Sequence, residues 1–313
     1  MNEYEIRERK VTIETQFGPW TADNIPLGYG IDTSPQRAGP HLLLRRVTQV
    51  IADLSREPWE QLRILDLGSL EGIYALEFAS RGAKVVGIEG RESNNAHARF
   101  AAEALGFSNI DFVTDDVRNL CHEKYGQFDV VFCSGILYHL PGYDACRLLS
   151  SIAQVCKRLL IIDTHVGLKP ETSINWEGHS YHGFTFSEHS SEDTPEVKAS
   201  RKWASLDNET SFWFTKPSLL NLLRDVGFTS AFEILSPKSF SLYSDRLTFA
   251  VTIGSRQPCR MSPELTHTPE PDWPELSNLT PFPAQAISME QPPSTVVRQL
   301  WRRIAGLRHK LGF

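Results

Sequence analysis

The sequence predicts an α/β fold with a doubly wound, mostly parallel sheet of seven strands. Short apolar runs of strand length recur between residues 63 and 253 and alternate with segments of helical periodicity. Several runs are apolar throughout, as is typical of strands covered on both faces. Glycines close several of the helical segments, where helices commonly stop.

The first unit, residues 63–91, reads RILDLGSLEGIYALEFASRGAKVVGIEGR. A buried strand ends at Gly68, a turn runs to Gly72, and a helix follows until Gly82. A second apolar strand then ends at Glu89. A strand, glycine loop, helix, strand and acid in this order predict a site for an adenosine-bearing cofactor, the alternative being an α/β core without a nucleotide.

The later elements continue the alternation. Helices are expected at 42–54, 92–105 and 143–156 and from 215 onward, where Pro217 stands near the first helical position. The remaining strands are expected at 110–114, 128–133, 159–163, 232–235 and 247–253, the last two as a hairpin-like pair.

The spacing of the first loop distinguishes between cofactors. A dinucleotide fingerprint, GxGxxG, needs a glycine at its third residue, where this chain has Leu70. Asp66 precedes the first glycine, and a carboxylate there suits a cationic ligand such as S-adenosylmethionine, which carries an amino group and a sulfonium but no phosphate. Glu89, 23 residues after Asp66, is expected to bind both ribose hydroxyls.

The motifs DLGSLEG, the acid in GIEGR, TDDV and FDVVFCSGILYHL, in that order, resemble those of class I S-adenosylmethionine-dependent methyltransferases. GILYHL followed by LLIIDTH, and later SFWFTKPSLLNLLRDVGF, is similar to a bacterial branch akin to the tRNA wobble-uridine (mo5U34-like) methyltransferases. That branch also includes methyltransferases of small molecules or glycans. The resemblance covers about residues 15–254 and implies the Rossmann-like methyltransferase fold with S-adenosylmethionine as cofactor.

The loop and the resemblance together predict the cofactor-binding residues. Asp115 and Asp116 both follow the third strand, and the resemblance favours Asp116 with Val117 as the adenine contact without deciding between the two acids. The expected set is Asp66, Gly68, Ser69, Leu70, Gly72, Glu89, Gly90, Asp115, Asp116, Val117, Ser134, Gly135 and Tyr138.

Two histidines are candidate general bases. His139 follows the fourth strand beside Tyr138, where both would flank the transferred methyl group, and His165 ends the fifth strand. Histidine titrates near neutrality and can deprotonate a hydroxyl. The alternative for each is a structural histidine bonded to a loop carbonyl. The HSYH segment has an HxxH spacing but no further ligand at a recognisable interval, so no metal site is expected.

Residues 166–211 are polar and aromatic, and they follow the fifth strand at the edge where such sheets bind ligands. A loop of this length is expected to be functional, here as a lid over the substrate. Trp203, Asn208, Glu209 and Trp213 are the expected substrate contacts, although Trp213 also suits a place in the core.

The chain is expected to divide into a cover segment (1–60), a methyltransferase domain (61–254) containing the lid, a proline-rich linker (255–294) and a basic amphipathic helix (295–313). Nine prolines between 258 and 293 favour an extended linker. The final helix suits a peripheral membrane or protein contact, or folds back on its own domain.

Composition narrows the function. A net charge of −6 over 313 residues disfavours nucleic acid, whose phosphates need a basic surface. Five scattered cysteines, no apolar N-terminal signal region and no apolar stretch of membrane-spanning length indicate a cytoplasmic protein. The expected activity is methyl transfer to a small-molecule, sugar or secondary-metabolite acceptor, chiefly at oxygen. The alternatives are a tRNA uridine-modifying enzyme and a binding or scaffold module.

Overall fold

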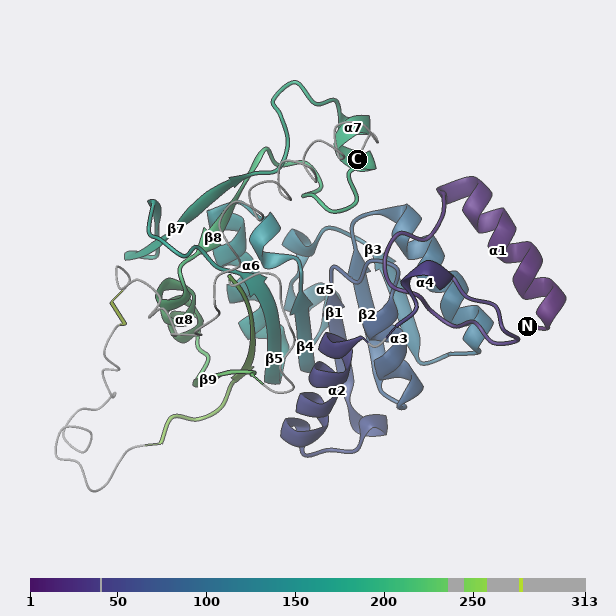
Figure 1. Ribbon diagram of the computed structural model, residues 1–313. Helices are drawn as coiled ribbons and strands as arrows, with labels where there is room; N and C mark the ends of the chain where they lie inside the picture. The colour runs from purple at the N-terminus through teal and green to yellow at the C-terminus, as the bar shows by residue number, and fades with distance from the viewer. Residues whose placement is uncertain (40, 236–244, 258–275, 278–313) are drawn as a thin grey trace, which may run out of the picture.

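The computed structural model describes residues 1–39, 41–235, 245–257 and 276–277 (Figure 1). Most of the expected linker (255–294) and the whole expected terminal helix (295–313) lie outside these residues, so a partner or membrane contact through that helix stays a prediction. Within the described part of the chain, no helix has the length and apolar character needed to cross a membrane.

The central sheet has seven strands in the order β3-β2-β1-β4-β5-β10-β9, which confirms the predicted fold class. Five strands are parallel, and β10 runs antiparallel to both β5 and β9 as the expected hairpin-like pair. The strands are β1 (Arg63–Leu67), β2 (Lys84–Glu89), β3 (Ile110–Thr114), β4 (Phe128–Ser134), β5 (Cys156–His165), β9 (Ser230–Glu233) and β10 (Arg246–Thr252). Chain order reverses between β1 and β4, which leaves a crevice at their carboxyl ends.

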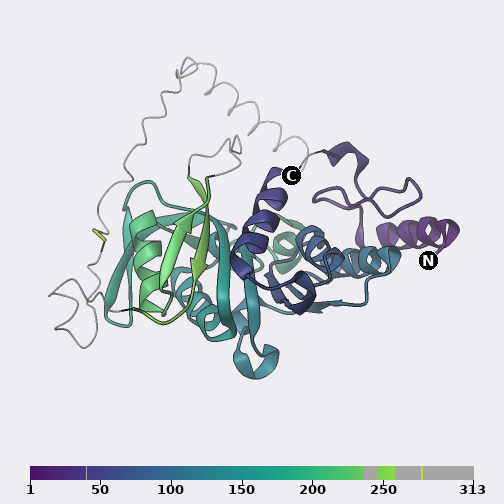
Figure 2. The ribbon, with the colours of Figure 1, turned by 90° about the horizontal axis from the view of Figure 1, so that it is seen from below.

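Helices cover both faces of this sheet (Figures 1 and 2). One face carries α2 (Leu42–Ser55), α3 (Ile73–Ser80) and α4 (Glu92–Leu105), and the other carries α5 (His122–Tyr125), α6 (Gly142–Val155) and α8 (Lys216–Asp225). Thr215 caps α8 by accepting a hydrogen bond from the Ser218 amide, with Pro217 in the first turn as expected. Short 3₁₀ turns are η1 (Pro35–Arg37), η2 (Trp59–Gln61), η3 (Val117–Asn119) and η4 (Leu137–His139).

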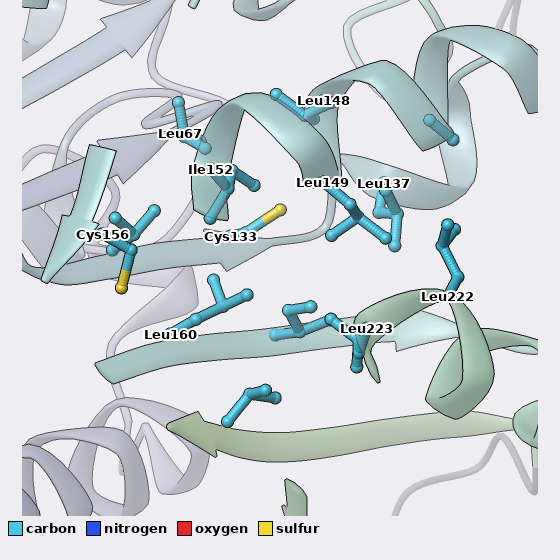
Figure 3. Packing of buried hydrophobic residues seen from close by; sticks show 14 of the residues in the cluster. Leu67, Cys133, Leu137, Leu148, Leu149, Ile152, Cys156, Leu160, Leu222 and Leu223 are labelled. Carbon is cyan, nitrogen blue, oxygen red and sulfur yellow. The ribbon is translucent and has the colours of Figure 1, made fainter. Parts of the chain in front are cut away.

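The parallel strands alternate their side chains between two cores. On β1, Ile64 packs with α2 and α3, whereas Leu65 packs with α6 and α8. Figure 3 shows the second core, where Cys133 of β4 and Leu160 of β5 lie among leucines and an isoleucine of α6 and α8. Each such leucine stabilises the fold by about 1.5–3 kcal/mol when fully buried. This packing fixes the strand ends that carry the site.

The lid contains a second sheet, whereas the sequence suggested a loop. Strands β6 (Thr172–Trp176), β7 (His179–Ser187) and β8 (Thr210–Phe214) pair antiparallel, and α7 (Pro195–Ser200) lies between β7 and β8 in the chain. Glu177 and Gly178 join β6 to β7 with positive φ angles of 47° and 86°. A two-residue turn with both φ angles positive matches the twist of a hairpin, and this Glu-Gly pair was the overlooked signal.

The N-terminal segment crosses the carboxyl edge of the sheet. It begins with α1 (Glu3–Phe17), a helix that the sequence did not predict and that packs alongside α4 (Figures 1 and 2). Asn2 and Glu5 form a reciprocal capping box at its start. Residues 18–41 then run to α2 and pass the glycine loop of the first unit.

Glu71 fastens this segment to the glycine loop. Its buried carboxylate accepts hydrogen bonds from the Thr21 amide at 2.7 Å and the Ala22 amide at 2.8 Å. It also lies 3.5 Å from Nδ1 of buried His97, whose ring stacks on Trp20. Burial opposes ionisation, but the bonds from His97, Thr21 and Ala22 hold the pKa of Glu71 below its ordinary value.

We expect Glu71→Gln to lower the free energy of unfolding at pH 7 by about 1–3 kcal/mol, because one amide donor then faces the glutamine NH2 group. Urea unfolding measures this, with Glu77→Gln, which removes an exposed ion pair with Arg81, as the control. Since the folded pKa of Glu71 is depressed, its stabilisation is present above the unfolded pKa of about 4.3 and is lost as pH falls through the folded value. A wild-type–variant difference that stays constant from pH 7 to pH 3 would contradict this role.

Candidate functional site

A cavity of about 380 Å³ lies at the carboxyl ends of β1, β2 and β4. The N-terminal segment forms one wall and lid residues 202–208 form another. Most of the residues expected from the sequence line it: Asp66, Gly68, Ser69, Leu70, Gly72, Glu89, Gly90, Asp116, Val117, Ser134, Gly135, Tyr138, His139, Trp203 and Asn208. Asp115, His165, Glu209 and Trp213 do not.

The glycine loop wraps the end of β1. Gly72 has a φ of +90°, and a Cβ there would lie 2.8 Å from the Phe112 ring, so only glycine fits. The backbone amide of Leu70 donates to Oε2 of Glu89 at 3.0 Å, and the amide of Arg91 donates to Oε1 at 2.9 Å. These two bonds orient the Glu89 carboxylate at the cavity wall and leave lone pairs for a ligand.

Asp66 is a buried acid of the cavity wall with one carboxyl oxygen that has no partner in the described residues. It is 2% exposed, and its Oδ2 accepts no hydrogen bond from the described residues. Burial raises the pKa of Asp66 to about 8, against a hydrogen bond from the Ala75 amide and with a contribution from the Glu89 charge. A buried, unpartnered carboxyl oxygen in the lining fits a cationic ligand.

The two adjacent acids after β3 point in different directions. Asp115 accepts hydrogen bonds from Lys124 at 2.6 Å, from the Asn119 side chain at 2.8 Å and from the Tyr125 hydroxyl. Burial opposes these bonds, but they lower the pKa of Asp115 to about 2. Asp115 therefore lies outside the cavity lining, with its carboxylate bonded to these partners. Asp116 faces the cavity instead.

The turn after β4 places the candidate base. Gly135 has a φ of +73°, and the following η4 turn brings Tyr138 and His139 into the lining. Nδ1 of His139 lies 2.9 Å from Oε1 and 3.1 Å from Oε2 of Glu188 in the lid. Sequence reasoning missed Glu188, which lies 49 residues from His139 along the chain.

His165 and Trp213 lie behind the cavity wall, contrary to expectation. Their rings stack with centroids 4.8 Å apart, and the His165 ring meets Tyr138 edge-on at 4.7 Å. On its other side Trp213 stacks on Phe186. Nδ1 of His165 lies 3.2 Å from an oxygen of Asp245. The pair therefore supports Tyr138 from behind.

Of the three remaining lid residues predicted to contact the substrate, two line the cavity and one does not. Trp203 lines the cavity while 60% exposed. Asn208 lines it too, but its side-chain amide donates to the backbone carbonyls of His139 and Thr210 at 3.0 and 2.9 Å. The side chain of Glu209 is exposed outside the lining, and its carbonyl accepts a hydrogen bond from the Glu188 amide. A substrate role for Glu209 is therefore not supported by its position.

Two arginines hold the lid on the cofactor side. Nη2 of Arg91 donates to the carbonyls of Arg201, Ala204 and Ser205 at 3.0–3.1 Å. Arg118 pairs with Asp116 and, at 2.9 Å, with Asp207 of the lid. Between these contacts Leu206 lies so close to Gly90 that a Cβ there would meet it at 2.4 Å. These contacts could not be predicted from the sequence, because they join Arg91 and Arg118 to backbone carbonyls and a carboxylate far along the chain.

The N-terminal wall contributes a second histidine–carboxylate pair. Nε2 of His41 lies 3.1 Å from Asp23, and Nδ1 accepts a hydrogen bond from the Leu44 amide, so both ring nitrogens are engaged. Opposite, Arg246 lines the cavity and binds buried Asp163 at 2.6 Å. Among the described residues, no group of three or more histidine, cysteine or acidic side chains is arranged to hold a metal ion.

Residues 64–158 match the family model described as "Methyltransferase domain". Ubiquinone biosynthesis O-methyltransferase of Acinetobacter baumannii (strain AYE) is 35% identical over 104 residues, which cover 33% of this chain and 41% of that protein. The O-antigen chain terminator bifunctional methyltransferase/kinase WbdD of Escherichia coli is 32% identical over 124 residues, covering 37% of this chain and 17% of that protein. This chain thus spans less than half the length of either relative.

Among solved structures, the N-terminal domain of EvdMO1, crystallised in the presence of SAH and D-fucose, has a TM-score of 0.62 at 24% identity. The match covers 82% of this chain and 98% of that chain, and it shows a shared fold. These comparisons support a methyltransferase and give no support to the tRNA wobble-uridine branch. Residues 64–158 therefore match a methyltransferase domain, and the chain shares the fold of the EvdMO1 N-terminal domain.

Proposed function

We propose that this protein transfers the methyl group of S-adenosylmethionine to a hydroxyl of a small-molecule, sugar or secondary-metabolite acceptor, with His139 as the general base. The observation that carries the proposal is the state of the His139 ring. Its Nδ1 is bonded to Glu188, whereas its Nε2 makes no hydrogen bond within the described residues, and the ring lies in the cavity lining. A free ring nitrogen in the lining is what a base needs.

The cofactor side of the cavity supplies a matching set of groups. Asp66 would pair with the amino group of S-adenosylmethionine, and Glu89 would bind its ribose hydroxyls. Asp116 and Val117 would contact the adenine ring. Gly68, Ser69, Leu70, Gly72 and Gly90 bring backbone close to the ligand, and Ser134, Gly135 and Tyr138 line the methionine end. The unpartnered oxygen of Asp66 supports this fit, because it lacks a partner that a cation provides.

The comparison between the two cavity histidines favours His139 as the base. His41 uses one nitrogen to accept from the Leu44 amide and holds the other against Asp23, so it has no lone pair to offer. His165 is outside the lining, behind Tyr138. His139 alone of these three, within the described chain, combines a place in the lining with an unbonded nitrogen.

The chemistry then needs positioning and one proton transfer. Bound S-adenosylmethionine supplies an electrophilic methyl group attached to sulfonium. The acceptor oxygen forms its bond to the methyl carbon as the carbon–sulfur bond breaks, with that electron pair staying on sulfur. The hydroxyl proton passes to Nε2 of His139, and Trp203 and Asn208 border the acceptor from the lid.

The acceptor is tested with a panel of monosaccharides, sugar nucleotides and phenols. We expect S-adenosylhomocysteine to accumulate only when a hydroxylated acceptor is present. Calorimetry that detects no binding of S-adenosylmethionine or S-adenosylhomocysteine to the full chain would overturn the proposal.

Binding of S-adenosylhomocysteine at pH 7 is expected to release close to one proton, about 0.9, because a carboxyl with a pKa of about 8 must ionise to pair with an ammonium group. Calorimetry in two buffers of different ionisation enthalpy measures the number of protons. Asp66→Asn should bind more weakly and release none from this site. If the wild-type binding heat is the same in both buffers, after correction for protons released by the ligand itself, no proton leaves the protein. That result would refute ionisation of Asp66 on binding.

His139→Asn should cut turnover by about 100-fold or more while leaving the dissociation constant of S-adenosylhomocysteine within about twofold. Asparagine keeps an N–H near the position of Nδ1 to satisfy Glu188 and removes the nitrogen that takes the proton. His122→Asn, on the exposed side of α5, is the matched control and should keep wild-type turnover. Wild-type turnover by His139→Asn at every pH would show that His139 is structural.

A further inference from the structure

Glu188 is a buried carboxylate with every oxygen occupied. It directly follows β7, its side chain is 2% exposed, and it belongs to the lid rather than to the central sheet. Besides His139, it accepts hydrogen bonds from the Ser211 hydroxyl at 2.8 Å and from the Ser205 amide at 3.0 Å. Three donors from different parts of the chain converge on one carboxylate, so its orientation is fixed.

The charge of Glu188 determines the state of the His139 ring. Burial works against ionisation, but hydrogen bonds from His139, Ser211 and the Ser205 amide hold the pKa of Glu188 below its ordinary value. An ionised carboxylate can only accept hydrogen bonds, so Nδ1 of His139 must carry the proton. The lone pair is then on Nε2, toward the cavity.

The same lid segment connects Glu188 to the cofactor side. Ser205 donates its amide hydrogen to Glu188, while its carbonyl accepts from Arg91 at 3.1 Å and from Nε2 of His189 at 2.9 Å. The Arg91 amide in turn donates to Glu89, the expected ribose ligand. A continuous set of bonds therefore joins the ribose end of the cavity to the imidazole.

We propose that Glu188 is the positioning residue of the reaction: it holds His139 as the Nδ1–H tautomer with Nε2 in the cavity and stabilises the imidazolium after proton transfer. This inference rests on the proposed function of His139 as the base. Glu188 itself touches no reacting atom in this assignment and acts through the imidazole. Ser205, within the cavity-lining stretch 202–208, supplies one of the three donors that fix Glu188.

The test uses the full chain labelled with [15N]histidine and saturated with S-adenosylhomocysteine. Long-range 1H–15N correlation spectra distinguish protonated from unprotonated ring nitrogens, and the His139 signals are assigned by their loss in His139→Asn. We expect Nδ1 protonated and Nε2 unprotonated in the wild type. In Glu188→Ala we expect this single tautomer to give way to a mixture of tautomers. A wild-type proton on Nε2, or an unchanged single tautomer in Glu188→Ala, would overturn the proposal.

Glu188→Gln keeps the shape of the side chain and removes the charge, which covers the case that Glu188→Ala does not fold. We expect its turnover with an acceptor from the panel to fall by about tenfold or more, with the acceptor KM and the dissociation constant of S-adenosylhomocysteine within about twofold of wild type. Glu192→Gln, an exposed glutamate of the same lid segment, is the matched control and should leave both constants and turnover unchanged. Full turnover by Glu188→Gln would also overturn the proposal.

The two measurements separate this inference from the proposed function. The spectra require only the chain and S-adenosylhomocysteine, so they decide whether Glu188 orients His139 whichever acceptor is used. Wild-type turnover by His139→Asn together with the expected tautomer would refute the function of His139 as a base and would leave Glu188 as a structural partner only.

Discussion

The turn between β1 and α3 is the constraint on which the rest of the site depends. One amide of this turn, that of Leu70, orients the Glu89 carboxylate, and the next side chain, Glu71, binds two amides of the N-terminal wall. Gly72 lets the turn lie against Phe112 of the sheet. The turn at residues 68–72 thus lines the cavity, orients Glu89 and holds the N-terminal wall. A distortion there would disturb all three, whereas most surface changes on the flanking helices would not reach the cavity.

The cofactor half of the site was predictable because the residues that form it lie close together in the sequence. Strand, turn and helix signals follow one another within residues 63–91, and parallel strands necessarily bring their carboxyl ends to one edge. His139 could be placed for the same reason, since it follows β4 directly. The mostly parallel sheet of seven strands followed from the alternation and from the resemblance, whereas the order of its strands comes from the structure.

The acceptor half was less predictable because its contacts join distant segments. Glu188 is one acid among several in a polar stretch, and nothing in its neighbourhood distinguishes it from Glu209, whose side chain is exposed. The choice between Asp115 and Asp116 depends on Lys124 and Tyr125, which bind the carboxylate of Asp115. His165 ends β5 at the same edge of the sheet, but its ring lies against the ring of Tyr138 rather than in the cavity lining. The hairpin turn at Glu177-Gly178 was a readable signal that the lid contains a sheet.

The hydrogen bonds from Arg91 to three lid carbonyls bear on the access of water to the cavity. Residues 202–208 line the cavity, and the amide of Ser205 in this stretch donates a hydrogen bond to Glu188. The same segment therefore borders the cavity and helps to hold the carboxylate that orients His139. Under the proposed role of His139, displacing residues 202–208 would remove the Ser205 amide from Glu188 and so loosen the carboxylate that orients the imidazole. If His139 is the base, this link would make its activation depend on the same segment that encloses the cavity.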